Sequence, residues 1–175
     1  VALNELGHKH ERLACPLQLS AVRSSILGAR PDVVFNLVES LGGQGRLIHV
    51  APSLLDPMGV PYTGCPSDAV WLTSNKLAAK RILSGAAIPT PEWHSLDQLQ
   101  RGARLHPGRF ILKSVWEHAS RGLDEDSVIE CQGAGHLATA LQARLPQLAG
   151  EGFAERYIDG REFNLSLLSS STQAS

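Results

Sequence analysis

Lys113 is the residue of this sequence whose position most favours chemistry with an anion. It ends the apolar run Phe110-Ile111-Leu112 and is followed by a polar loop that contains Ser120 and Gly122. A lysine at the end of a buried strand can set a point charge against phosphate oxygens, while loop amide groups surround the same oxygens. The alternative is that Lys113 only extends its ammonium group into water, and position alone favours this.

Lys76 and two carboxylates are weaker candidates when each is judged alone. Lys76 lies in the first turn of a predicted helix, where the helix dipole mildly disfavours a positive charge. A bound anion or chance could explain a lysine there. Glu155 and Glu162 flank the Asp159-Gly160 step, and most carboxylates at such positions are simply solvated. None of the three indicates a site by itself.

The elements that must position these residues begin with a predicted strand–helix–strand unit. Residues 33–38 form a continuous apolar run with β-branched side chains, typical of a strand buried on both faces in a parallel sheet. A turn with three glycines follows at 39–45. Apolar residues at spacings of three and four then predict a helix over 47–58, and the next extended segment begins after Gly59. This order predicts an α/β fold.

The remaining elements are short. We expect further helices over 20–27, 74–83 and 135–145, and strands over 110–113, 128–129 and 152–158. The helix at 74–83 is expected to begin at a Thr or Ser cap and to end near Gly85. The Asp159-Gly160 step predicts a β-hairpin, whose second strand would alternate apolar Phe163, Leu165 and Leu167 with polar residues.

Composition and charge exclude several classes of protein. The chain has 175 residues, 43% of them hydrophobic, and its formal net charge of -1 gives no basic surface for nucleic acid. No apolar run approaches the roughly 20 residues that span a bilayer. Three distant cysteines (15, 65 and 131) and seven histidines without ligand spacing predict neither disulfides nor a metal site. We therefore expect a cytoplasmic protein whose partners are small molecules, not nucleic acid or a membrane.

Both ends of the sequence predict a chain that is cut short. Residues 1–7 read as the end of an amphipathic helix that closes on Gly7. Residues 162–175 begin as a strand that has nothing to pair with. We expect missing sequence on both sides.

Four segments occur in an order that resembles the ATP-grasp family. They are Ser74-Asn75-Lys76 with Lys80 and the stretch 85–91, then Phe110-Ile111-Leu112-Lys113, then the loop 117–122, then the stretch 153–163. Upstream, Val34-Phe35-Asn36-Leu37 and the segment 59–64 look like the amino-terminal domain of D-alanine–D-alanine ligases. The resemblance covers about residues 32–168. No single segment carries it, but four in this order and spacing do.

The resemblance implies nucleotide contacts for the matching residues. Lys76 and Lys113 would contact the phosphates of ATP. Glu155 would hold the adenine edge together with backbone groups of the three residues after it, which are Arg156, Tyr157 and Ile158. Glu162 would accept hydrogen bonds from the ribose hydroxyls.

The resemblance also implies catalytic candidates. The loop that contains Glu117 and Ser120 would close over the phosphates, and Ser120 would order the reacting groups. Such a loop would exclude water and protect an acyl-phosphate from hydrolysis. Glu117 and Ser120 are therefore the expected catalytic residues.

The implied architecture has three parts. An N-terminal βαβ domain, Rossmann-like and preceding the ATP-grasp unit, would span residues 1–73. A small α+β ATP-grasp subdomain would span residues 74–151, and residues 152–175 would begin the C-terminal ATP-grasp subdomain.

The implied reaction is ATP-dependent peptide-bond formation for cell-wall peptidoglycan. One amino acid's carboxylate would take the γ-phosphoryl group of ATP, and the amine of a second would attack the acyl-phosphate. Magnesium would bridge the phosphates, with its protein ligands expected beyond Ser175. The chain alone is then expected to bind nucleotide without turnover.

Two departures from the family pattern keep alternatives open. Glu39-Ser40 stands where many D-alanine–D-alanine ligases have a His-Gly pair, and His118 and Ala119 replace a glycine and a serine of the phosphate loop. A ligase for another amino acid or peptide is one alternative, and a non-catalytic nucleotide-binding module is another. A homodimer is also open.

Overall fold

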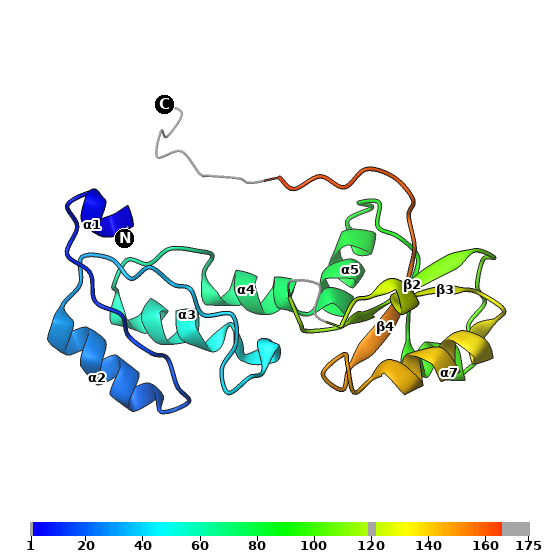
Figure 1. Ribbon diagram of the computed structural model, residues 1–175, viewed down its shortest axis with the longest axis horizontal. Coiled ribbons are helices and arrows are strands. Elements are labelled where there is room, and N and C mark those ends of the chain that lie inside the picture. The colour runs from blue at the N-terminus through cyan, green and yellow to red at the C-terminus, as the bar shows by residue number, and fades with distance from the viewer. Residues whose placement is uncertain (1, 119–121, 166–175) are drawn as a thin grey trace.

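Helices make up most of the first half of the chain, and a small β-sheet lies in the second half (Figure 1). The computed structural model describes residues 2–118 and 122–165. Within these ranges no helix is long and apolar enough to cross a membrane. In chain order the elements are α1 (Ala2–Glu5), α2 (Leu19–Ala29), the 3₁₀ helix η1 (Gly45–Leu47), α3 (Val50–Leu55), η2 (Asp56–Met58), α4 (Ser67–Ser74), α5 (Lys76–Gly85), β1 (Trp93–Ser95), α6 (Leu96–Gln100), β2 (Arg109–Ser114), η3 (Glu125–Ser127), β3 (Val128–Glu130), α7 (Ala134–Arg144) and β4 (Gly152–Arg156).

The sheet has four antiparallel strands in the order β1-β4-β2-β3, and one of its faces is apolar. Helices α6 and α7 pack against that face. Burying each large apolar side chain there contributes about 1.5–3 kcal/mol to stability. The buried cluster consists of Leu99, Phe110, Leu112, Leu137, Ala138, Leu141, Leu148 and Ala154.

The opposite face of the sheet carries a lysine and a glutamate. Lys113 pairs with Phe153 and Ile111 pairs with Glu155, so these four side chains share one face. Helix α5 lies on this side of the sheet and α7 on the other (Figure 1). A slip of one residue in the strand register would move Lys113 into the apolar core. The core therefore fixes the face on which Lys113 stands.

The first half of the chain is built on a smaller apolar cluster. Helices α2 and α3 supply its buried members Val22, Ile26 and Leu55. The helix predicted over 20–27 is confirmed as part of α2, and the helix predicted over 47–58 appears as η1, α3 and η2 in succession. It ends at Gly59, whose φ of 64° is a left-handed conformation that glycine adopts without strain.

The predicted strand over 33–38 is wrong. A single parallel bridge joins Val34 to Tyr62, and the flanking residues form no further bridge within the described residues. A strand buried on both faces needs neighbouring strands and covering helices, and the described residues supply only this one short contact. Three apolar side chains of the run are consequently exposed: Val33, Phe35 and Leu37. The isolated bridge joins the segments before and after η1, α3 and η2, but the predicted Rossmann-like sheet is not confirmed.

The predicted hairpin at Asp159-Gly160 is also wrong for the residues described. β4 already has β1 on one edge and β2 on the other, so no edge is free for a following strand. Residues 157–165 run away from the sheet without forming a strand (Figure 1). Phe163 and Leu165 are exposed, and Leu167 lies outside the described residues.

Several other predicted elements are confirmed, and four observed ones were not predicted. The strands predicted at 110–113 and 128–129 and the helix at 135–145 correspond to β2, β3 and α7, and the strand predicted at 152–158 corresponds to β4, which ends at Arg156. Helix α4 and the short elements β1, α6 and η3 have no predicted counterpart. Their three to eight residues are too few for a clear apolar period.

The start of α5 differs by one residue from the predicted cap. The capping residue is Asn75, whose side-chain oxygen accepts a hydrogen bond of 2.9 Å from the amide of Ala78. The expected Thr or Ser cap is therefore wrong, because those residues end α4 instead. Asparagine fulfils the same chemical role at a helix start.

The predicted boundary at residue 152 would divide a continuous sheet. β4 begins at Gly152 and lies between β1 and β2. The backbone hydrogen bonds of β4 thus tie residues 152–156 to the segment 74–151 and not to residues 157–165.

Candidate functional site

A pocket of about 280 Å³ opens between α5 and the face of the sheet that carries Lys113. It brings together three of the predicted site residues, Lys76, Lys113 and Glu155, and adds Lys80. Three ammonium groups thus face a single carboxylate, so the pocket favours an anion. The lining residues are Thr73, Lys76, Ala79, Lys80, Leu83, Thr90, Pro91, Lys113, Phe153 and Glu155.

Two local arrangements aim the predicted phosphate lysines into this pocket. Lys113 points there because Leu112 and Ser114, its neighbours in β2, are buried on the other face. Lys76 is the first residue of α5, and its amide donates to the carbonyl of Val115 at 3.1 Å. That bond joins the start of α5 to the end of β2, so the two lysines converge from different elements.

Glu155 is the centre of an ion-pair network. Its Oε1 lies 2.5 Å from Nζ of Lys80, and its Oε2 accepts a hydrogen bond of 2.6 Å from Nζ of Lys113. Burial by itself raises the pKa of the Glu155 carboxyl, but the hydrogen bonds and charges of Lys113 and Lys80 hold it below the ordinary value. Glu155 is therefore ionised at neutral pH.

Lys76 carries its charge in a less favourable setting. Burial, and then the nearby charge of Lys113, lower the pKa of Lys76, although Glu117 and Glu155 oppose this. Its Nζ donates to the backbone carbonyl of Glu117 at 2.6 Å. An anion bound in the pocket would relieve the repulsion between Lys76 and Lys113.

Glu117, predicted as catalytic, has an anchoring contact in the structure. Its side chain is buried, and Oε1 accepts a hydrogen bond of 3.3 Å from the amide of Gly45 in η1. A Cβ at Gly45 would lie 3.1 Å from both that oxygen and the carbonyl of Trp116, a contact tighter than ordinary van der Waals distance. The side chain of Glu117 does not line the pocket, and its catalytic role stays a prediction.

The residue after Glu117 also lies close to Lys76. Partial burial, followed by the charge of Lys76, lowers the pKa of His118, while Glu117 and Glu39 act in the opposite direction. Ser120, the other predicted catalytic residue, lies outside the described residues, as does Ala119.

Of the predicted adenine segment, Glu155 lines the pocket, and the three residues after it do not. The side chain of Arg156 is on the other face of the sheet, where it donates to the carbonyl of His106 at 3.1 Å. The amides of Arg156 and Tyr157 already donate to Glu92 and Arg109, at 2.7 and 2.9 Å. In the part of the chain that is described, the amide of Ile158 has no such acceptor.

Glu162 is not brought to the pocket. It lies in the exposed segment after β4 and does not line the cavity. The ribose contact predicted for it therefore has no counterpart in the arrangement of the described residues.

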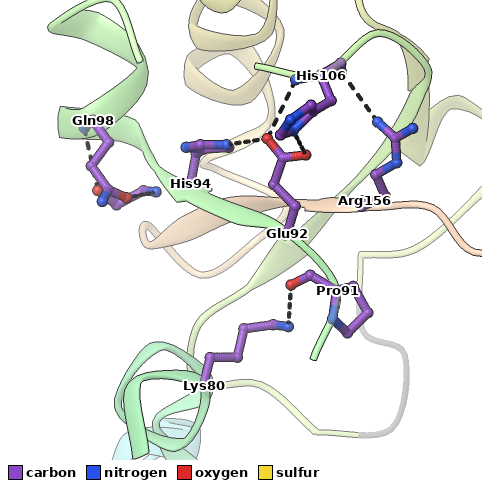
Figure 2. Close-up of polar contacts among 8 residues, drawn as sticks. Lys80, Pro91, Glu92, His94, Gln98, His106 and Arg156 are labelled. Atoms are coloured by element: carbon purple, nitrogen blue, oxygen red, sulfur yellow. Dashed lines mark hydrogen bonds and ion pairs between the residues drawn. The ribbon is translucent and has the colours of Figure 1, made fainter. Parts of the chain in front are cut away.

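Sequence reasoning missed a second polar cluster, centred on Glu92 (Figure 2). Its carboxylate contacts Nε2 of His94 at 2.9 Å and Nδ1 of His106 at 3.0 Å. Burial would raise the pKa of Glu92, but the hydrogen bonds from His94 and His106 keep it below its ordinary value. The cluster ties β1 to the loop before β2. The spacing of these residues along the chain matches no motif and gave no signal for the cluster.

Among the described residues, no group of three or more histidine, cysteine, aspartate or glutamate side chains is placed to hold a metal ion.

Sequence comparison relates the chain to curated proteins about twice its length. It is 31% identical over 180 residues to a D-alanine–D-alanine ligase of Synechococcus sp. (strain JA-3-3Ab), across 96% of this chain and 51% of that protein. It is 30% identical over 175 residues to the uncharacterized protein y4sG of Sinorhizobium fredii (strain NBRC 101917 / NGR234), across 95% and 49% respectively. The chain thus spans about half the length of the curated relatives it matches. No protein-family model matches it.

Structure comparison gives neighbours with several activities. D-alanyl-alanine synthetase A from Vibrio cholerae superposes with a TM-score of 0.52 at 20% identity, over 73% of this chain and 38% of that one. The L-amino acid ligase from Bacillus licheniformis superposes with a TM-score of 0.54 at 20% identity, over 81% of this chain and 30% of that one. A third neighbour is the biotin carboxylase domain of Hydrogenobacter thermophilus 2-oxoglutarate carboxylase, solved with MgADP. It superposes with a TM-score of 0.57 at 15% identity, over 82% of this chain and 32% of that one.

The antiparallel sheet and these neighbours show a mixed α/β fold like that of the D-alanyl-alanine synthetase and the biotin carboxylase domain. The homologues of the chain include D-alanine–D-alanine ligases, with identities of 31% and 33% over 96% and 82% of the chain. The resemblance inferred from the four sequence segments is confirmed.

Proposed function

We propose that this chain binds ATP in the pocket between α5 and the sheet, as part of an ATP-dependent carboxylate–amine ligase. The ligase most consistent with its relatives joins two D-alanine residues through an acyl-phosphate. The observation that carries the proposal is the convergence of Lys76 and Lys113 on one pocket. Magnesium would accompany the nucleotide, as it does in the MgADP-bound neighbour, but the described residues assign it no ligand.

The lysines suit the phosphates of ATP for electrostatic reasons. Each ammonium group is a compact charge with three rotatable donors, and in the described residues Lys76 and Lys113 each donate to one acceptor. Donors therefore remain for phosphate oxygens. Phosphoryl transfer depends mainly on such positioning and charge neutralisation. The pocket is near the lower end of ligand pockets, roughly 300–1,000 Å³, which suits the phosphate part of a nucleotide.

The base and ribose would lie toward the segment after β4. The amide of Ile158 supports this proposal, because it is the one amide of residues 156–158 without an acceptor in the described structure. Glu155 would contact the adenine edge from β4. Glu162 would reach the ribose only if the segment after β4 folds toward the pocket when nucleotide binds.

The proposed domain layout follows the sheet. Residues 1–73 form an N-terminal unit and residues 74–156 an ATP-grasp subdomain. We move the second boundary from residue 152 to the end of β4, since β4 lies inside the sheet. The segment from Tyr157 would lead toward a C-terminal subdomain.

Isothermal titration of ATP with magnesium against the wild type and Lys113→Ala tests the proposal. We expect saturable binding by the wild type and none by Lys113→Ala. Lys9→Ala, at an exposed lysine that does not line the pocket, is the matched control and should bind as the wild type does. Equal affinities for all three proteins would remove the proposal.

A ligase for another carboxylate is the second candidate. It is favoured by His118 and Ala119 in the phosphate loop and by the structural likeness to an L-amino acid ligase. Phosphate release by the complete protein with ATP and D-alanine, compared with L-amino acids and dipeptides, separates the two. Binding of ATP without phosphate release on any substrate would favour a non-catalytic nucleotide-binding module.

The oligomeric state is a separate proposal. The biotin carboxylase neighbour is described as a dimer, and a homodimer of the complete protein is the corresponding expectation. Sedimentation equilibrium would test it.

A further inference from the structure

Lys80 is the most deeply buried charged group of the pocket, with 7% of its surface exposed. Its Nζ contacts three acceptors: Oε1 of Glu155 at 2.5 Å, Oγ1 of Thr90 at 2.7 Å and the carbonyl of Pro91 at 3.2 Å. Figure 2 shows the side chain reaching from its helix to Pro91. A lysine ammonium has three N–H groups, so all of them are used. Lys80 therefore has no donor left for an incoming anion.

Lys113 differs from Lys80 in its exposure and in its number of acceptors, although both lysines contact the same carboxylate. The Lys113 side chain is 31% exposed against 8% for Lys80. Its one acceptor in the described structure is Oε2 of Glu155, at 2.6 Å. The two oxygens of Glu155 are thus divided between a lysine whose donors are all used and a more exposed lysine that has donors left for a ligand in the pocket.

We propose that Lys80 is a positioning residue that keeps Glu155 neutralised when Lys113 turns from the carboxylate to a phosphate of bound nucleotide. The inference rests on the proposed function, because it assumes a polyphosphate ligand. A buried carboxylate left without a counter-ion is strongly unfavourable. With Lys80 in place, Lys113 can exchange one anionic partner for another, and Glu155 keeps a charged hydrogen-bond donor throughout.

A purely structural role for Lys80 is the competing explanation. Its bonds to Thr90 and Pro91 tie α5 to the segment that leads into β1. On that view, loss of Lys80 lowers the stability of the protein, and any effect on ATP affinity is the same at every pH. The proposal instead predicts an effect on affinity that depends on the charge of Glu155.

Titration of ATP with magnesium into Lys80→Met, Glu155→Gln and the double variant distinguishes the two. We expect Lys80→Met to weaken ATP binding about tenfold or more near pH 8, because Glu155 then holds Lys113 more firmly. The loss of ATP affinity should shrink as the pH falls and Glu155 becomes protonated.

In the Glu155→Gln background Lys80→Met should have little effect on ATP affinity. Lys80→Arg, which keeps the charge, should keep most of the affinity. A loss that is equal at both ends of the pH range and persists with Glu155→Gln overturns the inference.

A measurement on the wild type covers the case in which Lys80→Met does not fold. ATP binding in buffers of different ionisation enthalpy, near pH 6, reports proton uptake on binding. We expect Glu155 to take up no proton. The number of protons taken up on ATP binding should therefore be the same for the wild type and Lys80→Arg. The ¹³C chemical shift of the Glu155 carboxyl reports whether it takes up a proton. Such uptake would contradict the inference. If the wild type does not bind ATP, the proposed function itself is overturned. If the wild type binds ATP and Lys80→Met binds it with the same affinity, only the role of Lys80 is overturned.

Discussion

The side chain of Glu117 accepts a hydrogen bond from the backbone amide of Gly45, 72 residues earlier in the chain. The carbonyl of the same glutamate accepts from Nζ of Lys76 at 2.6 Å. Glu117 therefore connects η1, the segment after β2 and the start of α5. The position of Lys76, which is proposed to contact the ATP phosphates, therefore depends on the helical first half of the molecule.

Substitution of Gly45 tests this connection. An added Cβ would lie 3.1 Å from Glu117 Oε1 and from the Trp116 carbonyl, so both must shift. We expect Gly45→Ala to lower the free energy of unfolding by about 1–2 kcal/mol, measured by urea titration. Gly28→Ala is the matched control, since it lies in α2 with nothing within 4 Å, and should be neutral or slightly stabilising. Equal effects of the two changes would show that the Gly45 contact is unimportant.

Gly122, at the far end of the proposed phosphate loop, gives a second stability prediction. Its φ is +73°, and an added Cβ would lie 2.6 Å from the carbonyl of Gln147. Gly102 has a φ of +77° with nothing within 4 Å, so Gly102→Ala measures the backbone strain alone, about 1 kcal/mol. We expect Gly122→Ala to cost about 1–3 kcal/mol more than that. Thermal unfolding of both variants gives the difference, and a difference near zero would contradict the close approach to Gln147.

The pH dependence of stability follows from Glu155. Its folded pKa lies below the ordinary value of 4.5, so its contribution is present above that pH and is lost as the pH falls through the folded pKa. Glu155→Gln lacks this contribution at every pH. We therefore expect the free energies of unfolding of the two proteins to differ near neutral pH and to converge in acid. Urea titrations from about pH 7 to pH 3 measure this, and parallel curves would argue against the Lys80–Glu155–Lys113 network.

The sequence predicts elements best where their signal is local. The helix at 135–145 was predictable because its apolar residues Leu137, Ala138 and Leu141 repeat on one face, and all three are buried in α7. The run 33–38 has an equally clear apolar signal but forms one bridge, because a strand also depends on partners that periodicity does not report. The hairpin prediction failed for a related reason: turn chemistry at Asp159-Gly160 could not show that both edges of β4 are occupied.

The candidate site shows the same division. Lys76, Lys113 and Glu155 could be selected from the sequence because they stand in recognisable segments, and the structure places all three on one pocket. Lys80 stands in one of those segments too, but its role depends on Thr90, Pro91 and Glu155, which only the fold brings to it. The pairing of Glu92 with His106 likewise left no signal in the sequence, because only the fold brings the segment before β1 to the loop before β2.

The central claim is that Lys76 and Lys113 meet the same nucleotide, and lysine acylation followed by mass spectrometry tests it on the unaltered protein. ATP should protect Lys76 and Lys113 from the reagent, because phosphate oxygens would occupy their ammonium groups. Exposed Lys9 should react equally with and without ATP, and buried Lys80 should react slowly in both cases. Unchanged acylation of Lys76 and Lys113 at saturating ATP would contradict the account.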